Sequence, residues 1–418
     1  MKLLISAYAC IPHRGSEPGV GWNWTLEHAR LGHEVWCITT PDGREAIEQE
    51  LKKHHTLNLH FIYVPSPAWA NWLYRFQPFV YFHYLLWQYN AAQVARRADK
   101  LVNFDLVLHI TLSSFQLGSG FWRLNKPMIF GPVGGGNFAP RAFKKYFGAS
   151  WLMEVLRRRT SDLLLRFNPD IRKVCRQARL ILVANRDTLR MARRYSAGDI
   201  RIFLDSGLSE DFFNGSIQPR PSGKMLKILW VGRIFARKGL PLVLEALSLV
   251  QVPFHLTILG NGKSGSKVPR WIRQYQLERK VSWLGQVSWE AARQAYLEHD
   301  VFLLCSLRDS FGSQFMEAMA YGLPIITLDH QGAGDHIPDE CGIKVPVTTP
   351  AETVGAVARA VAFMYHNPEK RLAFGRHGYH FARTQTWTEK VKKISRLYNT
   401  IAGINGPQAP VGKYESHS

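Results

Sequence analysis

Cysteine is scarce in this chain of 418 residues, and its five copies stand far apart. Their number is odd and no two of them form a CxxC pair, which argues against both a zinc site and a disulfide framework. A reducing compartment, the cytoplasm, is therefore expected. The apolar opening stretch, Met1–Ala7, is too short for the hydrophobic region and cleavage site of a signal peptide, and it predicts a first buried strand.

Acidic residues are also few relative to basic ones. There are 32 Asp and Glu residues against 53 Lys and Arg residues, so the formal net charge is +21. A surplus of this size indicates polyanionic surroundings, which nucleic acid, an anionic membrane surface or phosphorylated substrates would each supply. The charge alone does not choose among the three.

Long apolar runs are absent too. The stretch Pro65–Arg97 is densely aromatic, but Arg75, Gln77 and His83 interrupt it, so no run reaches the roughly 20 apolar residues that a spanning helix needs. This stretch predicts either an interfacial helix or a helix buried between domains. Residues Phe143–Arg172 again mix apolar and basic positions at helical spacing. No recognition motif for nucleic acid accompanies these basic residues, which favours a membrane over nucleic acid.

What the chain does contain is a steady alternation of short apolar runs with stretches of helical period. This alternation predicts parallel sheets with crossover helices, an α/β fold. We expect strands at Lys2–Ala7, Glu34–Thr39, Leu59–Val64, Leu106–Ile110, Met128–Phe130, Leu180–Ala184, Ile200–Phe203, Leu226–Val231, His255–Leu259, Val281–Leu284, Val301–Leu304 and Pro324–Thr327. We expect helices at Trp22–Leu31, Pro241–Val250, Pro269–Gln276, Trp289–His299, Ser313–Tyr321 and Ala351–Tyr365.

The length suits two domains, because a single core rarely grows beyond about 250–300 residues. Residues 1–200 are expected to form one doubly wound, Rossmann-like domain and residues 201–380 a second one that faces it across a central cleft. A helix within 381–404 is expected to pack back on the first domain, and the tail 405–418 to be disordered. In open parallel sheets ligands bind outside the carboxyl ends of the strands, so candidate residues directly follow a strand.

Glycine and cations follow the strand expected at Leu226–Val231, in the segment Val231–Gly239. Arg233 offers a planar fork suited to bidentate phosphate binding, and Lys238 adds a mobile point charge. Together they would neutralise a diphosphate whose charge grows as a bond to it breaks. Either cation alone would be ordinary in a loop of a basic protein, but glycines on both sides of this turn favour a binding loop.

Two carboxylates eight positions apart, Asp309 and Glu317, flank a later turn between strand and helix. Gly312, at the start of the helix, lets a ligand approach the backbone closely. A carboxylate accepts hydrogen bonds and can take both hydroxyls of a vicinal diol, so the pair suits a ribose and a hexose. Taken singly, Asp309 would serve as a helix N-cap and Glu317 as a surface residue, which leaves Gly312 unexplained.

The segment Ser306–Pro324 resembles the carboxylate-x7-carboxylate signature of family 4 retaining glycosyltransferases, which have the GT-B fold and use nucleotide-diphosphate sugars. Arg233 and Lys238 match the diphosphate-binding pair of that family in spacing and context. In the first half, Gly15–Trp22 resembles the family's first glycine-rich loop, although its G-x3-G-x-G spacing is not the dinucleotide fingerprint. Gly131–Gly136 resembles a loop of a bacterial polysaccharide-synthesis subgroup.

The resemblance implies roles for individual residues. Glu317 would bind the ribose of the donor and Asp309 would contact the transferred sugar, although the family more often has Glu at the position of Asp309. His109 occupies the place of a histidine that lines the active site, whereas a lone histidine at a strand end is more often a core residue. Donor contacts are implied for Gly232, Phe311, Gly312 and Ser313, and glycine-rich cleft loops for Gly19, Gly21, Gly134 and Gly135.

The activity implied is transfer of a sugar, with retention, from a UDP- or GDP-sugar to a hydroxyl of a lipid-linked or oligosaccharide acceptor in polysaccharide biosynthesis. No D-x-D triplet occurs, so neither a metal nor a cofactor is expected. The expected location is peripheral, at the inner face of the cell membrane, with no nucleic-acid partner. The alternative is a basic nucleic-acid- or membrane-binding scaffold with a catalytically silent glycosyltransferase fold. The carboxylate signature disfavours an epimerase or a phosphorylase.

Overall fold

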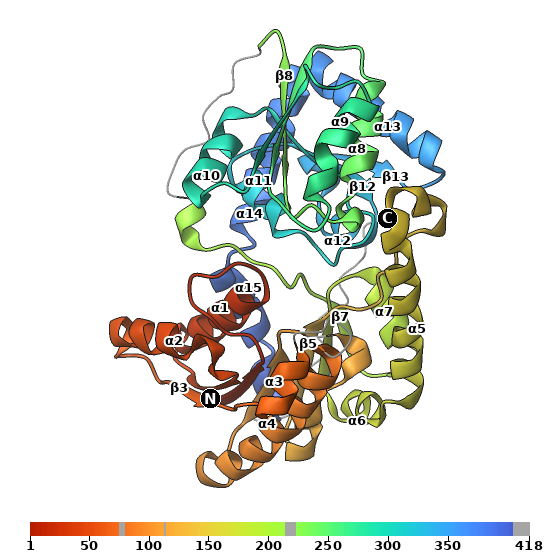
Figure 1. The fold of residues 1–418 in the computed structure, drawn as a ribbon. Helices are drawn as coiled ribbons and strands as arrows, with labels where there is room; N and C mark the ends of the chain where they lie inside the picture. Colours follow the sequence, from red (N-terminus) through yellow and green to blue (C-terminus); the bar gives the residue numbers. More distant parts are fainter. Residues whose placement is uncertain (75–79, 113, 214–222, 404–418) are drawn as a thin grey trace.

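The computed structural model describes residues 1–74, 80–112, 114–213 and 223–403, which form two α/β domains, each around a parallel sheet (Figure 1). The first sheet has the strand order β3-β2-β1-β4-β5-β6-β7. Its strands are β1 (Lys2–Ala7), β2 (Glu34–Thr39), β3 (Leu59–Tyr63), β4 (Leu106–Ile110), β5 (Met128–Val133), β6 (Leu180–Val183) and β7 (Ile200–Ile202). The helices of this domain are α1 (Ser16–Arg30), α2 (Arg44–Leu51), α3 (Ala68–Tyr74), α4 (Val80–Val102), α5 (Trp151–Phe167), α6 (Pro169–Gln177) and α7 (Arg186–Ala192).

The second sheet has the strand order β10-β9-β8-β11-β12-β13. Its strands are β8 (Leu226–Val231), β9 (Phe254–Leu259), β10 (Val281–Gly285), β11 (Val301–Leu304), β12 (Ile325–Asp329) and β13 (Gly342–Pro346). The helices that follow are α8 (Leu240–Ser248), α9 (Val268–Gln274), α10 (Trp289–Glu298), α11 (Ser313–Ala320), α12 (Gln331–His336), α13 (Pro350–His366), α14 (Pro368–Arg383), α15 (Trp387–Ser395) and α16 (Tyr398–Ala402).

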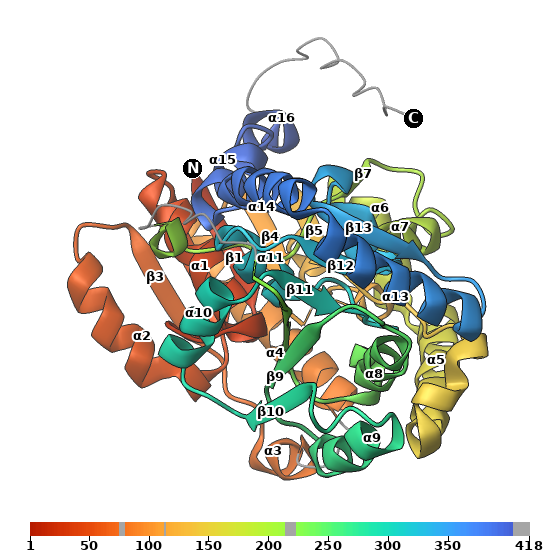
Figure 2. The same ribbon diagram turned by 90° about the horizontal axis from the view of Figure 1, so that it is seen from above.

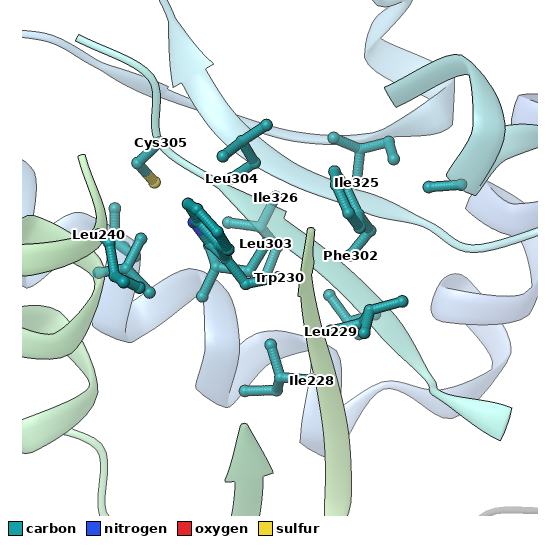
Figure 3. Packing of buried hydrophobic residues seen from close by; sticks show 14 of the residues in the cluster. Ile228, Leu229, Trp230, Leu240, Phe302, Leu303, Leu304, Cys305, Ile325 and Ile326 are labelled. Carbon is teal, nitrogen blue, oxygen red and sulfur yellow. The ribbon is translucent and has the colours of Figure 1, made fainter. Parts of the chain in front are cut away.

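The central strands are mostly apolar because helices cover both faces of each sheet. In the first domain Leu4 of β1 belongs to the core cluster beneath α4, and its neighbour Leu3 belongs to the cluster beneath α1. In the second domain Trp230 of β8 and Leu303 of β11 are fully buried, with Leu240 of α8 close by (Figure 3). Burial on both faces explains why the positions of these strands could be predicted from the sequence.

Two segments cross between the domains and lie side by side. The N–H of Leu208 donates to the carbonyl of Gln385 (3.2 Å), and the N–H of Trp387 donates to the carbonyl of Leu208 (3.0 Å). These bonds make a short parallel bridge between Leu208 and Thr386. The two domains are therefore joined by two connecting segments that are hydrogen-bonded to each other.

After the second crossing, α15 and α16 pack on the first domain, next to α1 (Figure 2). Trp387 and Val391 are buried in its core cluster. A ring nitrogen of His28 lies 2.5 Å from the hydroxyl of Tyr398. Burial lowers the pKa of His28 to about 3, so this histidine is neutral at ordinary pH.

The segment Ser16–Gly21 is helical, whereas the sequence predicts a glycine-rich loop there. Helix α1 begins at Ser16, well before the expected start at Trp22, so Gly19 and Gly21 lie within a helix and not in an open loop. A Cβ at Gly19 would lie 1.9 Å from the carbonyl oxygen of Arg14, and one at Gly21 would lie 2.1 Å from that of Ala9. These glycines therefore let α1 pack closely on the loop before it.

The aromatic stretch of the first domain has two distinct sides. Tyr84 and Trp87 of α4 are buried against the sheet, whereas Tyr81, Phe82 and Tyr89 are exposed. No helix within the described ranges is long and apolar enough to span a membrane. Residues 75–79 of this stretch, and the tail 405–418, lie outside the described residues.

Candidate functional site

The carboxyl ends of β8 and β11 lie at the edge of the second sheet that faces the first domain. The two strands are parallel neighbours, so the residues that follow them come together. The segment after β11 also contacts the first domain, where Arg308 pairs with Glu154 at 2.7 Å and Asn137 Nδ2 donates to Ser310 Oγ at 3.4 Å. Any ligand held by these loops therefore lies at the domain boundary.

A partly buried ion cluster occupies this edge. The carboxylate of Asp309 pairs with the ammonium of Lys238, which is almost fully buried, and with Arg237 Nη1 at 3.2 Å. Burial would raise the pKa of Asp309, but the two cations outweigh it and hold this pKa below its ordinary value. The structure thus joins the two expected residues and adds Arg237, which was not predicted although it adjoins Lys238.

Glu317 lies near this cluster on α11. Its Oε2 accepts a hydrogen bond from the hydroxyl of Tyr296 at 2.8 Å, and Ser313 also hydrogen-bonds to its carboxylate. Burial raises the pKa of Glu317, and these hydrogen bonds and the charge of Lys238 oppose the shift. Tyr296 comes from α10 and stacks on Tyr321, an arrangement that no local sequence signal indicates.

The other residues expected to bind the donor surround the same edge. Gly232 is buried at the end of β8, and Arg233 follows it with an exposed side chain. Phe311 is buried and Gly312 is the N-cap of α11, so the amino end of this helix faces the loop of Lys238. An arginine and a helix amino terminus are both suited to an anion.

Gln331 connects this edge to the first domain. Its Oε1 accepts a hydrogen bond from the N–H of Asp309 at 2.8 Å, and its Nε2 donates to the carbonyl of Phe138 at 2.9 Å. The side chain is buried, and the backbone is left-handed with φ of 51°. Such strain persists where the surrounding contacts fix it, often at functional sites. Gln331 could not be predicted from the sequence because its role depends on two segments distant in the chain.

The expected glycine-rich loop of the first domain reaches the same boundary. A Cβ on Gly134 would lie 3.0 Å from Ser310 Oγ of the second domain, and Gly135 packs on the amide of Gln116. Gly134 therefore lies close to the segment that contains Asp309, whereas Gly135 faces its own domain.

His109 lies in the core of the first domain. It is 1% exposed, its ring contacts Phe121 and Phe130, and its Nε2 lies 3.0 Å from the hydroxyl of Tyr84. Burial lowers the pKa of His109 to about 3, so the ring is neutral. Its Nδ1 has no hydrogen-bond partner among the described residues. The contact with a donor sugar stays a prediction.

Glu17, in the first turn of α1, is a further carboxylate on the side of the domain boundary. Its Oε2 accepts a hydrogen bond from the N–H of Leu112 at 2.9 Å, and both Thr111 and Leu112 have a left-handed backbone. Although the side chain is accessible, surrounding protein desolvates the carboxylate and raises its pKa to about 7. Asp205 raises it further, while the hydrogen bond opposes the shift.

The second domain matches a known family. Residues 216–381 match the family model of glycosyl transferases group 1. The phosphatidylinositol N-acetylglucosaminyltransferase GPI3 subunit of Saccharomyces cerevisiae is 23% identical over 238 residues, which cover 54% of this chain and 52% of that protein. The phosphatidyl-myo-inositol mannosyltransferase of Mycobacterium tuberculosis is 28% identical over 226 residues, covering 51% and 58%. The chain thus spans about half the length of the curated relatives it matches.

Solved structures match nearly the whole chain. Sucrose-phosphate synthase (tll1590) from Thermosynechococcus elongatus superposes with a TM-score of 0.67 at 17% identity, covering 97% of this chain and 100% of that one. Anabaena Alr3699/HepE in complex with UDP and glucose superposes with a TM-score of 0.60 at 15% identity, covering 96% and 100%. These similarities show the fold, and the expected GT-B class is confirmed.

Replacing Gly332, the second residue of α12, is expected to disrupt the support of the Asp309 loop. The Cβ of Gly332→Ala would lie 1.3 Å from the carbonyl oxygen of Ser310, a backbone atom that cannot swing away. We expect a loss of about 2 kcal/mol or more in the free energy of unfolding, measured by urea denaturation. In the control, Gly355→Ala inside α13, the Cβ would meet only the end of the Arg359 side chain, at 3.4 Å. Equal midpoints for the two variants would contradict the close packing.

Removing the charge of Glu17 is expected to stabilise the protein only at higher pH. The folded pKa is raised to about 7 from 4.5, so the folded state holds a proton that the unfolded state loses first as the pH rises. Glu17→Gln should match the parent in urea denaturation below pH 4.5 and exceed it above about pH 7. The exposed Glu278→Gln serves as control. A difference independent of pH would show that the carboxylate is well solvated.

Proposed function

Because residues 216–381 match the family model of glycosyl transferases group 1, we propose that the chain transfers a sugar from a nucleotide-diphosphate sugar to a hydroxyl acceptor. The observation that carries the proposal is the ion cluster of Lys238, Asp309 and Arg237 beside Glu317, at the carboxyl ends of two parallel strands. In doubly wound folds nucleotides bind at this place.

The proposed donor pose follows from the charges. Arg233, exposed at the end of β8, takes the diphosphate together with Lys238 and the amino end of α11. Glu317 accepts hydrogen bonds from the ribose hydroxyls, and Tyr296 holds this carboxylate in place. Asp309, held by its two cations, faces the sugar. A UDP-sugar is the favoured donor, since HepE of similar fold was solved with UDP and glucose.

The proposed reaction needs charge stabilisation more than proton transfer by a side chain. As the bond between the anomeric carbon and the phosphate oxygen breaks, its electron pair passes to the diphosphate, where Arg233 and Lys238 stabilise the negative charge. The acceptor oxygen bonds to the same carbon from the same face, which retains the configuration. Its proton passes to the released phosphate oxygen.

We propose further that the acceptor is lipid-linked and that the first domain binds an anionic membrane at the cytoplasmic side. Two relatives bear names with a phosphatidylinositol acceptor. On α3, Trp69 and Trp72 are 54% and 58% exposed, beside the exposed Phe82 of α4. Indole rings at the end of a basic domain suit the interface of a membrane with anionic headgroups.

The donor site can be tested without knowing the sugar. A thermal-shift screen against UDP, GDP and ADP should show stabilisation by one diphosphate, because a ligand that binds only the folded state raises the melting temperature. Arg233→Ala and Glu317→Ala should each abolish the shift, whereas the exposed Arg273→Ala should keep it. An undiminished shift in both site variants would exclude this donor site, and absence of sugar transfer or hydrolysis with bound donor would indicate a silent homologue.

Membrane binding is expected to depend on α3. Trp69→Ser with Trp72→Ser should weaken binding to phosphatidylglycerol vesicles about tenfold, because two exposed indoles no longer enter the interface. The matched control is Trp289→Ser, a half-exposed indole of the second domain. Vesicle sedimentation gives the affinities. Equal binding by all variants would exclude α3 as a contact, and a salt-sensitive affinity for DNA equal to that for vesicles would favour the nucleic-acid alternative.

A further inference from the structure

A cavity of about 250 Å³ lies between α5 and the segment that follows the glycine-rich loop of the first domain. It is distinct from the proposed donor site, and α5 runs along the outside of the molecule (Figure 1). Its lining residues share one face of α5 and one short segment: Phe138, Ala139, Arg141, Trp151, Glu154, Val155, Arg158, Arg159 and Asp162.

The cavity carries an excess of positive charge. Among the described residues, no carboxylate lies within ion-pair distance of Arg141, Arg158 or Arg159. One lining carboxylate, Glu154, is already paired with Arg308 at 2.7 Å. Three exposed arginines therefore line a small cavity, together with Asp162, which pairs with none of them. Guanidinium groups match the oxygens of a phosphate.

Arg157, which adjoins Arg158, adds a further positive charge to this part of the first domain. Arg157 donates to the carbonyl of Asn137 at 2.8 Å, and its guanidinium and that of Arg158 lie 5.6 and 5.0 Å from the ring centre of Phe138. Burial and then the charge of Arg308 lower the pKa of Arg157. A bound anion would interact favourably with this group of cations.

An apolar stripe adjoins the cavity on the solvent side of α5. Leu152, Leu156, Leu163 and Phe167 follow one another at helical spacing, and Leu152 and Phe167 are 73% and 67% exposed. The stripe borders the positions that line the cavity, because Leu152 and Leu156 lie three residues before Val155 and Arg159 on the same helix. A cationic cavity with an adjoining apolar stripe matches a ligand that joins a phosphate to an aliphatic chain.

The cavity is also connected to the proposed reaction site. Phe138, which lines it, accepts the hydrogen bond from Gln331, and the amide of Gln331 accepts one from Asp309. Asn137 donates to Ser310, the neighbour of Asp309. A ligand held in the cavity would therefore have a short path along the domain boundary to the sugar.

We propose that this cavity binds the phosphate or diphosphate of a lipid-linked acceptor, with Arg141, Arg158 and Arg159 on the phosphate and the aliphatic chain along the α5 stripe. This inference rests on the proposed function, because it names the acceptor class of the same reaction. The sugar end of the acceptor then points along Phe138 toward Asp309.

The test uses farnesyl diphosphate as a probe, with calorimetric titration of the full chain. Its affinity is measured in the presence of the nucleoside diphosphate found by thermal shift, which occupies the donor site, or without one if none binds. Arg158→Ala with Arg159→Ala should weaken binding about tenfold or more, because each loses charged hydrogen bonds to phosphate. The matched control, Arg172→Ala with Arg176→Ala on α6, removes the same charge from exposed positions of the same domain.

Three further ligands show whether the phosphate, the aliphatic chain or a bulk membrane surface accounts for the binding. Farnesol should bind weakly, since it lacks the phosphate, and inorganic pyrophosphate should bind more weakly than farnesyl diphosphate, since it lacks the chain. Unchanged affinity in the double variant, or an equal loss in the control, would overturn the cavity as the site. Equal affinity for pyrophosphate would overturn the lipid part, and stronger binding to phosphatidylglycerol vesicles than to farnesyl diphosphate would assign the arginines to the bulk membrane.

Failure of this inference and failure of the proposed function give different results. If no nucleoside diphosphate shifts the melting temperature, the donor site fails, whatever the affinity for farnesyl diphosphate. If the donor shift is intact in Arg158→Ala with Arg159→Ala and the lipid affinity is also intact, only the acceptor cavity fails.

Discussion

The structure depends most on one partly buried carboxylate and the groups that neutralise it. Asp309 is held by Lys238 and Arg237 on one side and, through its backbone, by Gln331 on the other. Removing one partner of a buried ion pair leaves an uncompensated charge, which costs more than the pair itself contributes. This cluster therefore fixes three loops of the second domain relative to one another, and Gln331 extends the same constraint to Phe138 of the first domain.

Much of the fold could be predicted from the sequence because burial on both faces leaves a clear apolar run. Strands such as Val301–Leu304 match the structure closely for this reason. Strand β13 was missed because its five residues include Gly, Lys and Pro, and it lies at the edge of the sheet. The start of α1 was misplaced because glycine usually disfavours a helix, whereas here close packing on Arg14 and Ala9 requires it.

Some residues of the candidate site could likewise be predicted from the sequence, and others could not. Lys238 and Asp309 were predicted because they lie in loops that follow buried strands, and Glu317 because of its spacing from Asp309. Arg237, Tyr296 and Gln331 were missed because each acquires its role only through a partner on another segment. His109 gave an ambiguous signal, and the structure places its ring among aromatic side chains of the core. The roles of all these residues toward a substrate stay predictions.

The paired crossing between the domains has a mechanical consequence. A single covalent connection would leave one domain free to swivel about the chain axis, whereas two adjacent connections, bonded at Leu208, Gln385 and Trp387, resist torsion. The paired segments therefore oppose a twist between the domains more strongly than a bend. Separating the halves by truncation would remove α15 and α16 from the first domain and expose the apolar surface that they cover. The first domain is therefore not an independent unit without α15 and α16.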